Sequence, residues 1–235
     1  FTHKSLDALK FLIQVAGLTA DEVRMVTPMN IPIIWAFPRE GLPIFKYLVE
    51  TLALTSEDVL VGYNDNILHI GYNDGILHDA CRLGNLDVIQ YVLSLPGISS
   101  KNITMDMVCS ALSPGHRHII KYFFDPQGPV QLTAKNVRDD NMEIMRSAAF
   151  GGHDQIFLYL FETLKLTTQD IRCDDNKILI SAISQGQLKV VKCLFETAGL
   201  TIADARAHGN SALNVAAKCG KADIIIYLIE HLNMC

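Results

Sequence analysis

The sequence predicts an all-α fold, a solenoid of stacked helix pairs with about six repeats and a partial repeat before them. The first observation is a unit made of an apolar residue, a Ser or Thr and, three places on, a carboxylate or amide. Its last three copies begin 34 residues apart, at Leu132, Leu166 and Leu200. The second observation is that the residues between the copies carry helical apolar spacing. The third is composition: 49% of the chain is hydrophobic and 19% is charged, which suits stacked helices and excludes a disordered chain.

Including the earlier copies, the unit recurs every 34 to 36 residues, with one interruption. They begin at Leu18, Leu54 and Ile98, and the longer step before Ile98 contains a duplicated stretch, Gly62–Asp65 and Gly71–Asp74. We expect one repeat domain over 1–235. We also expect the chain to be a piece of a longer protein, because interior-type apolar residues run almost to its end. The predicted repeat units are 1–26, 27–61, 62–104, 105–138, 139–172, 173–206 and 207–235.

The last repeat shows the plan of one unit. Residues 208–210 are expected to form a turn, 211–219 a first helix rich in small residues, and 223–230 a second helix, with Gly220 between the two helices. Leu213, Ala216 and Ala217 are predicted to share the buried face of the first helix. The same plan recurs in earlier repeats with alanine in the first helix and glycine after it, at Ala80 and Gly84, Ala111 and Gly115, Ala148 and Gly152, and Ala182 and Gly186.

The recurring Ser or Thr is predicted to cap a short helix. In Thr167–Asp170 and Thr201–Asp204 the hydroxyl can accept from the helix start, while the acid three places on reaches back to the capping residue. Thr55–Asp58 and Thr19–Glu22 follow the same pattern, and Thr133 with Asn136 and Ser99 with Asn102 are amide versions. Each box should start one helical turn that ends before the next Asp/Asn/Gly turn.

Composition and motifs narrow the function classes. The net charge of -5 argues against nucleic acid and anionic membranes as partners, because both favour a basic surface. No apolar run approaches the length of a membrane span. The six cysteines show no paired spacing, so we expect a reduced, intracellular and cytoplasmic setting. No nucleotide-binding, metalloprotease or nucleophile-elbow motif is present in the sequence.

The ionisable residues are better explained by structure than by catalysis. His116 and His118 form the only close histidine pair, and no third metal ligand is indicated. Asp58, Asp170 and Asp204 share one phase of the repeat, so stacking separates them and each can serve as a local cap. Arginines also share a phase and could bind phosphate or an acidic partner, but pairing with the neighbouring Asp turns is favoured for Arg24, Arg138, Arg172 and Arg206.

At this level of detail the chain resembles divergent members of the ankyrin-repeat family, with LTxxDxR-type repeats of about 34 residues. The stretch from Gly209 to Leu213, followed by Ala216, Ala217 and Gly220, is closest to the family pattern. Tetratricopeptide repeats have a similar period, but they use nearly all of it in two long helices. The capping box stands where ankyrin repeats have a β-hairpin, so we expect short helical turns to replace most hairpins. In the family, His78 would hold a structural position.

The resemblance implies a protein partner bound at loop tips and at the concave face of the first helices. Residues there that the repeat pattern does not explain are the candidates: Trp35, Asp79, Arg82, Ser110, Arg146, Ser147, Phe150, Ser181 and Lys218. Trp35 could equally fill a gap in the core. Tyr63 and Tyr72 join the candidates because the duplication lengthens their loop. A second irregularity, Asp125–Pro129, suggests a bend or hinge.

The predicted function is a monomeric, non-catalytic scaffold for protein–protein interaction, without cofactor or metal. The first alternative is a targeting or substrate-recruiting module of a larger enzyme or adaptor, such as a ubiquitin-ligase adaptor or a pathogen or virus effector. The second alternative is an enzyme within these residues, which would need a deep pocket with converging ionisable groups.

Overall fold

The computed structural model describes Lys10, Val15, residues 41–51, Ala53, 76–112 and 114–232. Every regular element in these residues is a helix, and none of them forms a strand. The chain divides into two compact units, Phe1–Ser110 and Ala111–Cys235. The predicted all-α class is therefore confirmed. The single domain and the repeat boundaries stay predictions.

Unit 1 contains a short helix hairpin. Its helices α6 (Ile76–Leu83) and α7 (Leu86–Ser94) pack against each other, and α4 (Gly41–Thr51) packs against α7. The turn between α6 and α7 uses Gly84 at φ 79°, and the side chain of Asn85 then caps α7 by accepting from the Val88 amide. Phe45 of α4 meets the Tyr91 ring edge-on at 5.7 Å between centroids. The 3₁₀ turn Ser100–Asn102 follows, and α8 (Met105–Leu112) begins in this unit.

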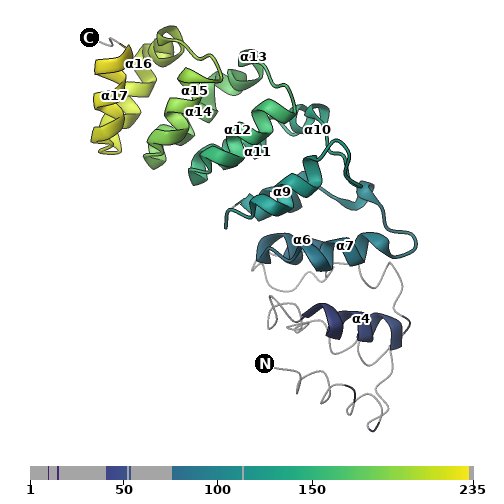
Figure 1. Cartoon of the computed structure of the whole chain (residues 1–235). Coiled ribbons are helices and arrows are strands. Elements are labelled where there is room, and N and C mark those ends of the chain that lie inside the picture. The colour runs from purple at the N-terminus through teal and green to yellow at the C-terminus, as the bar shows by residue number, and fades with distance from the viewer. Residues whose placement is uncertain are drawn as a thin grey trace, which may run out of the picture. The chain divides into compact units, whose positions relative to one another are not determined.

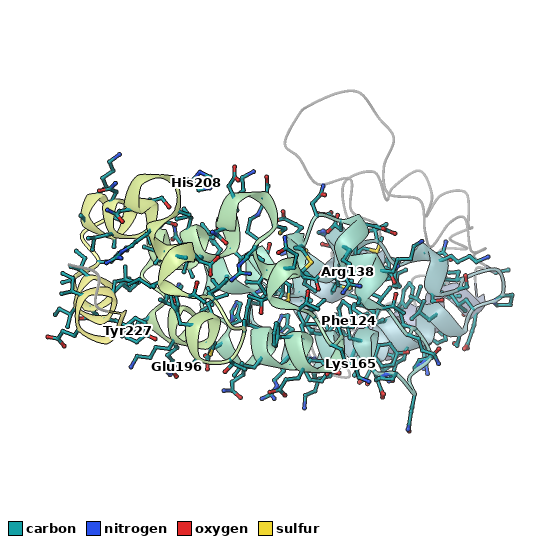
Figure 2. All side chains as sticks on the ribbon, turned by 90° about the horizontal axis from the view of Figure 1, so that it is seen from above. Phe124, Arg138, Lys165, Glu196, His208 and Tyr227 are labelled. Carbon is teal, nitrogen blue, oxygen red and sulfur yellow. The ribbon has the colours of Figure 1, made fainter. Side chains whose placement is uncertain are left out.

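Unit 2 is a stack of helix pairs arranged in two rows (Figure 1). The first-helix row contains α11 (Glu143–Gly151), α14 (Cys173–Gln185) and α16 (Ile202–Lys218). The second-helix row contains α9 (Arg117–Phe124), α12 (Asp154–Thr163), α15 (Leu188–Glu196) and α17 (Ala222–Leu232). Neighbouring helices within each row pack against each other, as do the two helices of each pair. Figure 2 shows Arg138 and His208 on the side of the first-helix row, and Lys165, Glu196 and Tyr227 on the other.

The core between the rows joins small residues of the first helices to larger ones of the second. Ala148, Ala182 and Ala216 are fully buried, as the repeat plan predicts. They let the neighbouring backbones approach while second-helix side chains fill the remaining space: Ile120, Phe123, Phe157, Leu160, Val190, Leu194, Ile224 and Leu228. Ala217, which was predicted on this face, is exposed. The last first helix starts at about Ser211, so Ala212 and Ala216, four residues apart, share its buried side.

A left-handed turn precedes the regular part of each of the first helices α11, α14 and α16. Asp174, Asp175 and Asn176 all have φ between 54° and 61°, and His208 to Asn210, 34 residues later, repeat this conformation. Asn141 and Met142 hold the corresponding place before α11, with φ of 50° and 59°. These turns separate the short box helix from the regular part of α14 and of α16. The predicted plan of box, single helical turn, and Asp/Asn/Gly turn is confirmed in these repeats.

Several predictions fall elsewhere. Trp35, Tyr63, Tyr72, the duplication and the boxes at Thr19 and Thr55 lie outside the described residues. The Asp125–Pro129 excursion lies within unit 2 and is a hydrogen-bonded turn, with the Gly128 amide donating to the Asp125 carbonyl at 3.0 Å. Its role as a hinge stays a prediction. In the part of the chain that is described, no helix is both long and apolar enough to cross a membrane.

Candidate functional site

In the described part of the chain, four capping boxes hold the loop tips in place. The backbone amide of each capping residue donates to the side chain three places on, at 2.9 Å for Ser99 to Asn102, 2.9 Å for Thr133 to Asn136, and 2.7 Å for Thr167 to Asp170 and Thr201 to Asp204. In Thr167 the hydroxyl also accepts from the Asp170 amide at 3.3 Å. In the two boxes that end in Asn, the side-chain amide oxygen accepts from the capping residue as the Asp carboxylate does in the other two, because both side chains offer an acceptor oxygen. Two short helices start at these boxes, α10 (Ala134–Asp139) and α13 (Thr168–Ile171).

Arginine side chains tie each box to the next one along unit 2. Arg138 donates from Nε and Nη2 to the two carboxylate oxygens of Asp170, at 2.6 and 2.9 Å. Arg172 makes the same fork with Asp204, at 2.7 and 3.0 Å. The predicted pairing of this arginine phase with Asp turns is confirmed for these two residues. Hydrogen bonding from Arg138 holds the pKa of Asp170 well below its ordinary value, and Arg172 lowers the pKa of Asp204 in the same way, against the opposing effect of burial.

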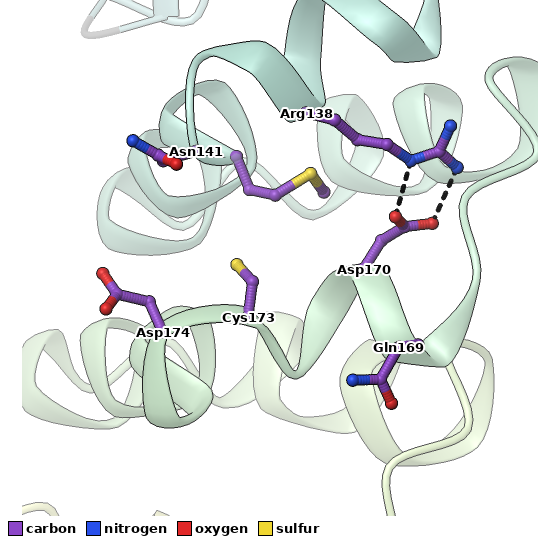
Figure 3. Close-up of a pocket in the computed structure, with 7 residues that line it drawn as sticks. Arg138, Asn141, Gln169, Asp170, Cys173 and Asp174 are labelled. Carbon is purple, nitrogen blue, oxygen red and sulfur yellow. Dashed lines mark hydrogen bonds and ion pairs between the residues drawn. The ribbon is translucent and has the colours of Figure 1, made fainter.

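An open pocket of about 440 Å³ lies between two successive loop tips of unit 2. Figure 3 shows Asn141 and Asp174 at one end, the Arg138–Asp170 pair at the other, and Cys173 on the wall between them. Gln169 and Met142 complete the lining, and the Met142 residue is only 2% exposed. The pocket therefore combines a sulfur-lined apolar wall with oxygen-bearing side chains at its mouth.

The pocket chemistry suits binding rather than reaction. Burial raises the pKa of the Cys173 thiol, and the Asp174 and Asp170 carboxylates raise it further, so the thiolate nucleophile is disfavoured. Asp170 is already held by Arg138, and Asp174 is paired with Lys177 at 2.5 Å. Among the described residues, no group of three or more His, Cys, Asp or Glu side chains could hold a metal ion.

A second candidate surface is the outward side of the first-helix row. Four residues of α11 at helical spacing share one stripe, namely Glu143, Arg146, Ser147 and Phe150. Arg146 forms an ion pair with Glu143, and the Ser147 hydroxyl donates to the same carboxylate at 3.1 Å. Phe150 is 54% exposed. The positions 34 and 68 residues later, none of them buried, continue the surface: Lys177, Ile180, Ser181, Ser184, Ser211, Asn214, Val215 and Lys218. We call these twelve residues the first-helix face.

The structure groups some of the predicted residues and separates others. Arg146, Ser147 and Phe150 share one stripe of α11, and Ser181 and Lys218 lie on the neighbouring helices of the same face. The remaining described candidates lie in unit 1. Asp79 and Arg82 of α6 form an ion pair at 2.9 Å, and the Ser110 hydroxyl donates to the Met107 carbonyl at 2.7 Å. Local pairing accounts for these three side chains.

His78 and His116 occupy structural places. His78 is buried in α6, with Nε2 3.5 Å from Asp106 Oδ2. The His116 carbonyl accepts from the Ile119 and Ile120 amides at the start of α9, and the His116 ring stands edge-on to that of His118 at 5.8 Å.

Sequence reasoning missed Glu143 and most of the pocket lining. Glu143 stands at the start of α11 and resembles an ordinary first-turn acid, although it organises both Arg146 and Ser147. Asn141, Met142, Gln169, Cys173 and Asp174 carry no motif. The available signal is their phase, because residues 141 and 142 recur as the turn residues 175 and 176.

Together, these features define an α-helical repeat protein whose loop tips are tied from one repeat to the next. Residues 144–234 match the family model for ankyrin repeats in three copies. The resemblance to the ankyrin-repeat family seen in the sequence is confirmed over these residues. No curated protein matches the chain. Ankyrin repeats are in general protein–protein interaction modules, and the family is typically non-catalytic.

Proposed function

We propose that this chain is a non-catalytic scaffold that binds a protein partner through the first-helix face and the adjoining loop tips of unit 2. The observation that carries the proposal is Phe150, which is 54% exposed on α11. Burial of a large exposed apolar side chain under a partner lowers the free energy of the complex. Aromatic and arginine side chains also contribute most of the binding energy at protein interfaces. Arg146 lies one helical turn before Phe150 on the same stripe.

The polar residues around Phe150 support a partner that binds by shape and hydrogen bonds as well as by apolar contact. Glu143 fixes the Arg146 guanidinium and the Ser147 hydroxyl before any partner arrives. Holding these groups in one arrangement lowers the entropy lost on binding. Ser181 and Ser184 continue the surface with hydroxyl groups, the second of which donates to the Ser181 carbonyl at 2.9 Å. The face therefore offers an aromatic anchor with an ordered polar rim.

The test is quantitative capture of a partner from the native source, with the partner then titrated against variants. We expect Phe150→Ala and Arg146→Ala each to weaken binding about tenfold, which is the loss of one strong interface residue. Ile226→Ala and Lys189→Ala are the matched controls. Ile226 is 50% exposed but lies on α17 of the second-helix row, and Lys189 is an exposed base on α15 of that row.

The two control variants show which row of helices the partner contacts. The proposal requires normal binding by Ile226→Ala and Lys189→Ala alongside the loss in the two α11 variants. Equal losses in both sets would indicate a general effect on the fold, and losses confined to the controls would move the interface to the second-helix row.

A further inference from the structure

We propose that the pocket between the two loop tips accepts a lysine or arginine side chain from the protein partner. This inference rests on the proposed function, because it assigns a chemical feature to the partner. The pocket is lined by Asn141 and Met142 from the turn after α10, and by Cys173 and Asp174 from the turn after α13. The Arg138–Asp170 ion pair closes its other end (Figure 3).

The shape of the lining fits a long side chain with a polar tip. Met142 is nearly buried and Cys173 is partly exposed, so the sulfur-bearing wall on which the methylene stem of lysine or arginine can lie is formed mainly by Cys173. Asn141 and Asp174 share the opposite end of the pocket from the ion pair, as Figure 3 shows. Their side chains bring an amide oxygen and a carboxylate, and both are acceptors for an ammonium or guanidinium group. A side chain that ends in a carboxylate would meet Asp174 and be repelled.

The equivalent space between the next two loop tips shows which pair of side chains can face each other at this position. Residues 34 places beyond Asn141 and Asp174 are Asp175 and His208. There the His208 Nε2 lies 3.5 Å from Asp175 Oδ1, so a basic group and a carboxylate face each other between the two turns. In the pocket, the same two positions carry Asn141 and Asp174, which bring acceptors but no basic group. A cation from the partner would complete the arrangement that His208 provides from within the chain.

The charged residues around Cys173 also favour a positively charged ligand. Burial raises the pKa of the Cys173 thiol first, and Asp174 and Asp170 then raise it more than Arg146 and Lys177 lower it. At this thiol the two carboxylates therefore outweigh the two nearby bases. Asp174 already contacts Lys177 of α14, but both side chains are about half exposed. Exposed pairs of this kind are weak, so Asp174 can exchange Lys177 for a partner's cation at little cost.

The experiment titrates the full chain, labelled with ¹³C-methyl methionine, with three short peptides. Acetyl-Gly-Lys-Gly-amide is the probe, and the peptides with norleucine or glutamate in place of lysine are its neutral and acidic counterparts. The Met142 methyl signal, assigned with Met142→Leu, reports occupancy. We expect a saturable shift with the lysine peptide and none with the other two. A shift of equal size with norleucine, or none with lysine, overturns the proposal.

Two substitutions with opposite expected effects sharpen the test. Asp174→Asn should weaken binding of the lysine peptide about three- to fivefold, and asparagine tolerates the φ of 54° at this position. Lys177→Gln should strengthen binding by a similar factor, because it removes the competing cation. Asp175→Asn changes the chain charge equally but lies outside the pocket lining, and should leave the affinity unchanged. Equal losses in Asp174→Asn and Asp175→Asn would show a long-range charge effect and overturn the proposal.

Binding measurements with the captured partner distinguish failure of this inference from failure of the proposed function. If Phe150→Ala abolishes capture and Asp174→Asn leaves the affinity unchanged, the pocket assignment fails while the scaffold function stands. If Phe150→Ala and Arg146→Ala both bind normally, the proposed face fails, and the peptide titration still decides whether the pocket takes a basic side chain.

Discussion

Replacing Asp204 tests whether the box-to-box ties stabilise the repeat stack. The residue is 7% exposed, and its carboxylate accepts from the Thr201 amide and hydroxyl and from two nitrogens of Arg172. Asp204→Ala removes all four hydrogen bonds together. The loss of the reach-back bond of a capping box costs about 1 kcal/mol. The loss of the Arg172 fork costs about 1 kcal/mol more, because Arg172 is partly exposed and regains water. We therefore expect the free energy of unfolding to fall by about 2 kcal/mol.

Asp204→Asn divides this loss into its two parts. The amide oxygen can still accept from the Thr201 amide, as Asn136 accepts from Thr133 in the earlier box. The charge that faces Arg172 is lost. We expect a cost of about 1 kcal/mol, and a double-mutant cycle with Arg172→Met should show a coupling energy of similar size.

Urea unfolding followed by circular dichroism is the assay, with an unchanged m-value as the check that the variants unfold in the same manner. An Asp204→Ala variant within about 0.5 kcal/mol of the parent would refute the reasoning, since surface substitutions without a structural role fall in that range. A coupling energy of zero would show that Arg172 and Asp204 contact each other without stabilising the chain.

Three further predictions follow from other features of unit 2. Because the folded pKa of Asp204 lies below its unfolded value, near 3.9, the stability that its charge adds is present above about pH 4 and lost as pH falls through the folded pKa. The difference in unfolding free energy between parent and Asp204→Asn should therefore shrink below about pH 4, and a constant difference down to pH 2 would contradict this. Lys165 is exposed at φ 50°, so Lys165→Gly should raise the free energy of unfolding by about 0.5–1 kcal/mol in urea melts, whereas Lys165→Ala should give no gain. Gly152→Ala should lower it by about 1–2 kcal/mol, because φ is +74° and the new Cβ would meet the Gln187 amide; thermal melts identical to the parent's would refute this reading.

The sequence predicted the local hydrogen-bonded motifs of the fold well. The Ser/Thr boxes are visible because both partners stand three residues apart, and the bonds that they make are local. The ion pairs of Arg138 and Arg172 were also predictable, since residues about one period apart lie close together in successive repeats of a stack. The left-handed residues Gln131 and Lys165 were not predicted from residue type. Their phase with Gly97 and Gly199, which share the positive φ, carries that information.

The candidate site was predicted only in part, because it depends on helix rotation and on contacts between repeats. Phe150 and Arg146 could be selected as candidates because they depart from the repeat pattern, and the structure places neither of them in the core. Ala217 was misplaced because a 34-residue period fixes neither the start of a helix nor its rotation. The pocket could not be predicted, since it exists only where Met142 of one loop tip meets Cys173 of the next.

Site-specific photocrosslinking tests the central claim most directly, because it reports which face a partner covers. A benzoylphenylalanine at Phe150 keeps the aromatic character of the exposed side chain on α11, and the same group at Ile226 of α17 samples an equally exposed apolar position on the second-helix row. The full chain carrying each group is irradiated with the captured partner. A covalent adduct from position 150 and little from position 226 is the predicted result. Adducts from position 226 alone, or equal yields from both positions, would contradict binding through the first-helix face.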